Sequence, residues 1–307
     1  MTALQPVVAD PSRLLEAEDD GLADAKGIGI AAWLSIGWLG LVAFSAFLAP
    51  VLPINDPNAE VASLPMLAPG QEGLLLGADA NSRDMLARLI YGGRNSLTIA
   101  FFAVLMGFVI GGLLGLLAGY FRNWIGNVLA GFFDILLAIP ALVLALALVA
   151  VLKGSPEATD SFRLPTIIIL IVSLGIVSIP LLARITRGAT LSWSQREFVT
   201  AARAQGATHR RILFREILPN VLPAMMYIAL LGVAIAIVAE GGLAILGASM
   251  DPPTATWGTM INDGRSSMEE APFIMFLPII VVFITVMALN YLGDVVRARF
   301  DVRESAL

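Results

Sequence analysis

Six long apolar stretches constrain what this chain can fold into more strongly than any other feature of its sequence. They cover residues 27–52, 97–120, 125–152, 165–184, 221–246 and 272–295. A helix of about 20 mostly apolar residues spans the hydrocarbon core of a bilayer, whereas the strands of a membrane β-barrel alternate apolar and polar residues. Because these stretches are continuously apolar, the sequence predicts an all-α integral membrane protein with six transmembrane helices.

The composition agrees with a membrane protein and argues against several kinds of functional site. Of the 307 residues, 58% are hydrophobic and 14% are charged, against roughly 45–50% and about 25% in soluble domains. Cysteine is absent and His209 is the one histidine, so we expect no disulfide, no thiolate nucleophile and no metal site. The formal net charge of −5 excludes a generally basic protein that binds nucleic acid.

The distribution of lysine and arginine predicts how the chain crosses the membrane. Six spans place both termini on one side, and cytoplasmic loops carry the excess of basic residues. With both termini inside, 13 of the 19 basic residues are cytoplasmic and 6 are outside. We therefore expect two cytoplasmic termini, with an acidic, disordered tail over residues 1–26 and a short tail over residues 297–307. The first span lies behind the acidic tail and is too long for a cleaved signal peptide.

The second span carries a strict four-residue glycine repeat, at Gly107, Gly111, Gly115 and Gly119. This spacing lines one face of a helix, and glycines on that face let two helix backbones approach closely in lipid. Two partners are compatible with the repeat: another helix of the same bundle, which we favour, or a helix of a partner subunit.

Between the first two spans, residues 81–93 form a short amphipathic segment. If the segment is helical, one of its faces carries Met85, Leu86, Leu89 and Ile90. This pattern is typical of a helix that lies on a membrane surface. We therefore expect an interfacial helix on the outer side.

The lysines argue against a nucleotide site of the phosphate-loop type. Lys26 and Lys153 are the two lysines of the chain, and neither belongs to a G-x-x-x-x-G-K-[ST] sequence. We therefore expect that this chain binds no ATP by itself and carries no catalytic residue. An intramembrane hydrolase is disfavoured, because it would depend on the single histidine, which lies in a basic loop.

Two acids interrupt the apolar stretches, Asp134 in the third and Glu240 in the fifth. A charged side chain at the centre of a membrane helix costs about 2.5–3.5 kcal/mol on insertion scales, so each acid should face protein or water. Either acid could line a translocation pathway, with Glu240 near its outer mouth, or could form structural hydrogen bonds between helices. The sequence leaves both interpretations open.

The most informative segment is the basic cytoplasmic loop over residues 185–220. A first helix over about residues 195–205 would end at Gly206, and Thr208 is a suitable N-cap for a second helix. Two short helices joined at a glycine form a compact knob that another protein can approach closely. We expect one packing face of the first helix to contain Phe198, Ala201, Ala202 and Gln205, and the second helix to carry Ile212, Leu213 and Ile217.

Several motifs resemble those of permease subunits in binding-protein-dependent ABC importers. Ala201-Ala202-x-x-x-Gly206, followed by Ile217-Leu218-Pro219, resembles the EAA loop of these subunits. Five segments resemble the C-type permease of the dipeptide/oligopeptide/nickel family and occur in the same order as in that family. They are residues 76–97, 133–140, 217–220, 252–258 and 290–294. The resemblance implies a type I ABC importer fold. A first helix and an external segment would occupy residues 27–96, and the permease core residues 97–296.

In this family the EAA loop docks into a groove on a cytoplasmic ATPase and transmits its movement to the membrane helices. The resemblance assigns this coupling role to the matching region, namely Glu197, Thr200, Ala201, Ala202, Gly206, Ile217, Leu218 and Pro219. This chain differs from the family's sequence at two places that bear on the assigned roles. Thr200 stands where the family has a glutamate, and residues 243–249 differ from the usual sequence after the acid of the fifth span.

The resemblance also implies partners and a location. It predicts a second homologous permease subunit, two ATPase subunits or domains that hold ATP and Mg, an extracytoplasmic substrate-binding protein, and the bacterial inner membrane. The resemblance does not identify the transported solute, because in this family the binding protein selects it. Di- or oligopeptides, nickel chelates and glutathione are the alternatives. A secondary transporter is the main alternative class, and it would show inverted repeats and several acids near the midplane.

Overall fold

The computed structural model describes residues 29–154 and 164–304, so the predicted tail over residues 1–26 lies outside the described residues. Within them the α-helices are α2 (Ile30–Leu48), α3 (Met85–Met106), α4 (Gly112–Tyr120), α5 (Trp124–Ala138), α6 (Ala141–Lys153), α7 (Thr166–Trp193), α8 (Glu197–Ala204), α9 (His209–Arg211), α10 (Leu218–Ile245), α11 (Trp257–Gly264) and α12 (Phe273–Glu304). Three 3-10 helices and two π-helical segments complete the helical structure: η1 (Ala49–Val51), η2 (Gln71–Gly73), η5 (Arg265–Ser267), η3 (Gly107–Gly111) and η4 (Ile212–Ile217). The predicted C-terminal tail over residues 297–307 begins inside α12.

Five helical units of the described chain are long and apolar enough to cross a membrane, namely Ile30–Val51, Met85–Tyr120, Thr166–Trp193, His209–Ile245 and Phe273–Ala298. The predicted third span, residues 125–152, is not one straight helix. It consists of Gly126–Ala138 and Ala141–Lys153, which meet at 91°. Pro140 explains the break, because proline lacks a backbone N–H and clashes with the preceding turn of a helix. With the bent pair taken as one span, the described chain has six candidate spans, and the prediction of an all-α membrane fold is confirmed.

The predicted interfacial helix over residues 81–93 is wrong as a separate element. α3 begins at Met85, where the Asp84 carboxylate accepts hydrogen bonds from the backbone N–H groups of Leu86 (2.8 Å) and Ala87 (3.4 Å). The helix then continues without a break through η3 and α4 to Tyr120. Met85 is 1% exposed, so the apolar face of this segment packs against the protein.

The glycine repeat packs against α7 of the same chain, which confirms the first of the two alternatives. A methyl group at Gly111 would lie 2.5 Å from the carbonyl oxygen of Ile179, and one at Gly115 would lie 2.3 Å from that of Ala183. Both distances are far shorter than a van der Waals contact. The missing side chains therefore allow η3 and α4 to lie directly on the α7 backbone.

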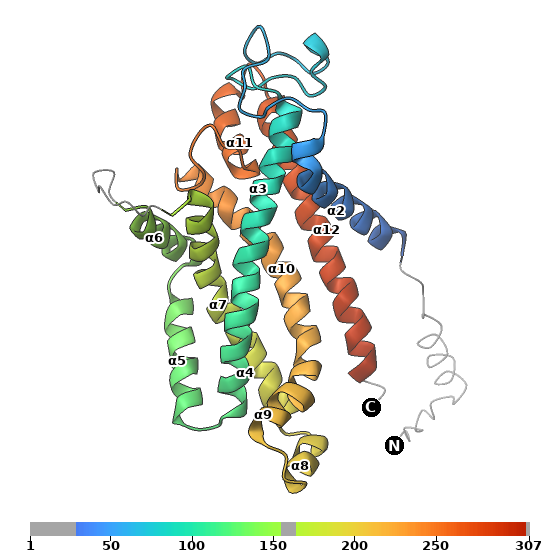
Figure 1. The fold of residues 1–307 in the computed structure, drawn as a ribbon, viewed down its shortest axis with the longest axis vertical. Helices are drawn as coiled ribbons and strands as arrows, with labels where there is room; N and C mark the ends of the chain where they lie inside the picture. The colour runs from blue at the N-terminus through green and yellow to red at the C-terminus, as the bar shows by residue number, and fades with distance from the viewer. Residues whose placement is uncertain (1–28, 155–163, 305–307) are drawn as a thin grey trace, which may run out of the picture.

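The helices form an elongated bundle (Figure 1). The continuous unit of α3 and α4 runs along its length with α7, α10 and α12. Side chains from α3, α10, α11 and α12 form one buried cluster between these helices, which includes Ala100, Val104, Ile237, Trp257 and Leu289. α8 lies at one end of the bundle, whereas α11 and the segment between α2 and α3 lie at the opposite end. The two ends of the bundle are therefore built from different elements, and each could carry a functional site.

Candidate functional site

The segment that joins α8 to α9 has the predicted helix–glycine–helix structure, but the predicted second short helix is the start of the continuous helical unit His209–Ile245. Gly206 has φ +78°, in the left-handed region that favours glycine. Its N–H donates to the Arg203 carbonyl, and the Ala207 N–H donates to the Ala202 carbonyl, each at 3.0 Å. These two hydrogen bonds form a Schellman motif that ends α8. The hydroxyl oxygen of Thr208 accepts from the backbone N–H of Arg211 at 3.4 Å and caps α9, as predicted.

A buried cluster holds residues 197–219 against the bundle. We call these residues the coupling segment, after the role that the resemblance implies for them. The cluster joins Val199 of α8 to α4, η4 and α10 through Leu116, Tyr120, Ile212, Leu213, Ile217, Val221 and Met225. Val199 is 0% exposed. Ala202 packs against the cluster one turn later, whereas Phe198, Ala201 and Gln205 are exposed. The predicted packing face was therefore right at Ala202 and wrong at Phe198, Ala201 and Gln205, because the buried side of α8 follows Val199.

The eight residues assigned to coupling fall into two groups. Ile217 is buried, while Ala202 and Leu218 are half-buried against the cluster. The others are exposed, namely Glu197, Thr200, Ala201, Gly206 and Pro219. The exposed group is accessible to another protein without a change in this chain, whereas the buried Ile217 is not.

Tyr120 belongs to the same region, although the sequence analysis missed it. Its hydroxyl shares a 2.7 Å hydrogen bond with Nδ1 of His209, and the guanidinium of Arg203 lies 5.4 Å from the centre of its ring. Tyr120 is 7% exposed and is the last residue of α4. One side chain thus contacts α8 through Arg203 and the start of the unit His209–Ile245 through His209. The sequence feature that could have indicated Tyr120 is its position directly after the last glycine of the repeat.

The structure places the two membrane acids in different environments. The Glu240 carboxylate is 1% exposed and accepts hydrogen bonds from the hydroxyls of Ser249, Thr256 (2.8 Å) and Ser96 (3.4 Å). It therefore links α10 to α3 and to the start of α11, and this favours the structural interpretation. Asp134 is exposed on α5, with Arg184 Nη1 at 4.0 Å.

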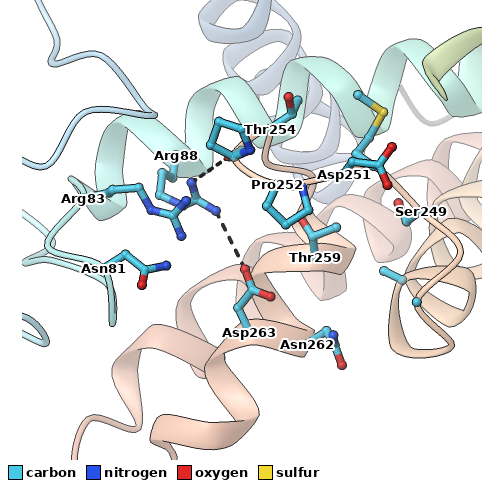
Figure 2. Close-up of a pocket in the computed structure, with 14 residues that line it drawn as sticks. Asn81, Arg83, Arg88, Ser249, Asp251, Pro252, Thr254, Thr259, Asn262 and Asp263 are labelled. Carbon is cyan, nitrogen blue, oxygen red and sulfur yellow. Dashed lines mark hydrogen bonds and ion pairs between the residues drawn. The ribbon is translucent and has the colours of Figure 1, made fainter. Parts of the chain in front are cut away.

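A polar cavity of about 330 Å³ is lined in part by α11 (Figure 2). It therefore lies at the end of the bundle opposite α8, where Figure 1 shows α11. Arg83, Arg88 and Asp263 line it, and Figure 2 shows these three side chains close together. Burial raises the pKa of the Asp263 carboxyl, partly offset by Arg88 and Arg83. At another part of the lining, the hydrogen bond from Lys153 lowers the pKa of the Asp251 carboxyl. No local sequence pattern indicates this site, since its residues come from segments far apart in the chain.

No group of three or more metal-ligating side chains is present among residues 29–154 and 164–304.

The profile of one protein family, the binding-protein-dependent transport system inner membrane component, matches residues 111–305. The chain belongs to this family. Relatives of the inner membrane component include the di/tripeptide transport system permease protein DppC of Pseudomonas aeruginosa. It is 36% identical over 266 residues, 85% of this chain and 84% of that protein. The glutathione transport system permease protein GsiD of Pectobacterium atrosepticum is 38% identical over 226 residues, 74% of this chain and 71% of that protein.

Solved structures share the fold of the inner membrane component. A chain of the MetNI methionine ABC transporter, in an inward-facing conformation, aligns with a TM-score of 0.57 at 22% identity. The alignment covers 70% of this chain and 97% of that chain. The type I importer permease fold implied by the motifs is thereby confirmed, as is the resemblance itself. The chain is a multi-pass permease subunit of an ABC importer, which works with an ATPase and a binding protein.

Proposed function

We propose that this permease imports short peptides through a passage that it forms together with a second homologous permease subunit. The relatives support this substrate class, because one is named for di- and tripeptides and another for glutathione, which is itself a tripeptide. Two ATPase subunits or domains bind ATP and Mg and drive the cycle. This chain contributes no catalytic residue and binds no nucleotide.

The exposed side of α8 is the observation that supports coupling to the ATPase. Val199 fixes one side of the helix in the buried cluster, so Glu197, Thr200 and Ala201 are left exposed. The small side chain of Ala201 lets a partner approach the helix backbone closely. Movement of the ATPase can then reach α4 and α10, because the same cluster contains Tyr120 and Val221.

The exposed Asp134 supports an association with a second permease subunit. Its side chain is 65% exposed in the single chain, and a charged group in a membrane span should not face lipid. The α5 face that carries Asp134 therefore faces either the second subunit or the water-filled passage between the two subunits.

The proposed orientation places the α8 end in the cytoplasm, together with both termini. Seven arginines between Arg184 and Arg215 favour this side. Reporter fusions after Gly206 should give a cytoplasmic signal, and fusions after Lys153 or at Gly264 an external one. A cytoplasmic signal at Gly264 would contradict the topology.

The coupling role is tested with Ala201→Glu in the reconstituted complex. A charged side chain at this exposed position should clash with the partner surface and lower ATPase association and transport at least tenfold, with normal membrane levels. Ala68→Glu is the matched control, because Ala68 is exposed in the segment before α3, at the other end of the bundle. Ala202 is a poorer test position, since it packs against the cluster of this chain. Normal transport by Ala201→Glu would refute the coupling role.

A further inference from the structure

The cavity at the end of the bundle opposite α8 has no part in the proposed coupling to the ATPase. It is formed by residues that lead into α3, by the first turn of α3, by the end of α10 and the loop after it, and by α11. Its volume of about 330 Å³ is at the lower end of the range for small-molecule pockets, roughly 300–1,000 Å³. The cavity is therefore large enough for a small solute.

Two buried arginines line one side of the cavity. Nε of Arg83 and Nε of Arg88 lie 2.8 Å and 3.1 Å from the same oxygen of Asp79, Oδ2. Arg88 Nη1 also donates to the carbonyl oxygens of Pro57 (3.3 Å) and Pro253 (3.2 Å). These contacts fix the Arg88 guanidinium, and the Asp79 carboxylate offsets only one of the two positive charges.

The balancing negative charge lies on α11, next to Arg88. Asp263 Oδ2 lies 3.9 Å from Arg88 Nη2, which is too long for a hydrogen bond. The Asp263 side chain is 54% exposed, whereas that of Arg88 is 3% exposed. Asp263 can therefore turn away while Arg88 stays in place. Next to it, the Asn262 side chain lines the cavity, as does that of Asn81 from the facing segment.

We propose that this cavity binds a small zwitterion of the amino acid or short-peptide class. Its carboxylate binds the terminal guanidinium nitrogens of Arg83 and Arg88, and its ammonium group binds the Asp263 carboxylate. The ligand thereby inserts between two charges that do not form a hydrogen bond with each other. Charge-assisted hydrogen bonds to arginine suit a carboxylate, and the burial of both guanidinium groups reduces screening by salt.

The inference rests on the proposed function for the source of the ligand, since a peptide importer brings such zwitterions to its outer side. The same arginines could instead receive an acidic side chain of the docked binding protein. The two sources differ in one property, because a free zwitterion binds when the binding protein is absent.

The test measures binding of L-alanyl-L-alanine to the purified importer complex in lipid nanodiscs, without the binding protein. We expect saturable binding, at least tenfold weaker for alanyl-alanine amide, which lacks the carboxylate, and for N-acetyl-alanyl-alanine, which lacks the ammonium group. Arg83→Gln should weaken binding at least tenfold, and Asp79 keeps Arg88 as its partner in this variant. Asn262→Leu should weaken binding severalfold. Asn58→Leu, outside the cavity lining, should leave it unchanged.

Three results would overturn the inference: no binding of the dipeptide, equal binding of the amide, or unchanged binding by both Arg83→Gln and Asn262→Leu. Weaker docking of the binding protein to Arg83→Gln, with no binding of free dipeptide, would assign the arginines to the binding protein and also overturn it. Failure here leaves the proposed function intact if the complex still imports dipeptides and Ala201→Glu still uncouples it.

Discussion

The hydroxyl of Tyr120 and Nδ1 of His209 lie 2.7 Å apart, so one hydrogen bond joins the last residue of α4 to the first residue of α9. The Arg203 guanidinium of α8 stacks over the same ring. Because α4 also lies on the α7 backbone through Gly115, a movement of the coupling segment should reach α4 and α7 together.

Tyr120→Phe tests this connection while it keeps the aromatic ring. The lost hydrogen bond contributes about 0.5–1.5 kcal/mol, so we expect a folded complex that hydrolyses ATP but transports severalfold less solute per ATP. Tyr91→Phe is a matched control, because it removes a 3.1 Å hydrogen bond to the Ala49 carbonyl, between α3 and η1. An equal transport-to-ATP ratio in both variants would contradict the connection.

Gly115→Ala should destabilise the bundle. The added methyl group would lie 2.3 Å from the Ala183 carbonyl oxygen. This oxygen belongs to the α7 backbone, so it can move away from the methyl group only if α4 and α7 separate. Overpacking of this kind costs about 1–3 kcal/mol, which thermal unfolding of the purified complex should show as a lower melting temperature. Gly188→Ala, in α7, adds a methyl group with nothing within 4 Å and should unfold like the wild type.

Glu240→Leu and Glu240→Gln distinguish the two interpretations of this acid. Leucine leaves the hydroxyls of Ser96, Ser249 and Thr256 buried without their acceptor, at about 1–3 kcal/mol for each unsatisfied group. Glutamine can still bond to them, so we expect low membrane levels for Glu240→Leu and near-normal levels and transport for Glu240→Gln. A well-assembled Glu240→Gln complex that fails to transport would instead support a role in the translocation pathway.

The ion pair between Lys153 and Asp251 should make stability depend on pH. Lys153 Nζ lies 3.0 Å from Asp251 Oδ1, and this hydrogen bond lowers the pKa of the Asp251 carboxyl from its ordinary 3.8. Folding therefore favours the ionised form. Its stabilising contribution is complete above the ordinary pKa and is lost as the pH falls through the lowered value.

The test compares the melting temperature of the wild type with that of Asp251→Asn over a range of pH. Because the Asp251 side chain is 68% exposed, the two proteins should differ little in free energy of unfolding, by about 0–1 kcal/mol. The difference should stay constant from neutral pH to about pH 5 and shrink below 3.8. A difference that grows in acid would show that another group dominates.

Features set by neighbours in the chain were predictable from the sequence. The end of α8 depends on Gly206 and its own backbone conformation, and the start of α9 depends on Thr208 and the N–H three residues later. The apolar spans follow from transfer of side chains out of water, which needs no knowledge of their partners. The EAA-like motif indicated the family for the same reason, since it is a local pattern.

Tertiary structure decided which faces of these helices meet. His209 is 89 residues from Tyr120, Glu240 is 144 residues from Ser96, and Pro253 is 165 residues from Arg88. Sequence patterns predict an apolar face or an unpaired charge, but the partner depends on how the helices pack and on the bend at Pro140. For this reason the sequence by itself determined the apolar stretches and the glycine turn at Gly206, whereas only the packed chain assembled the Glu240 hydrogen bonds and the arginine-lined cavity.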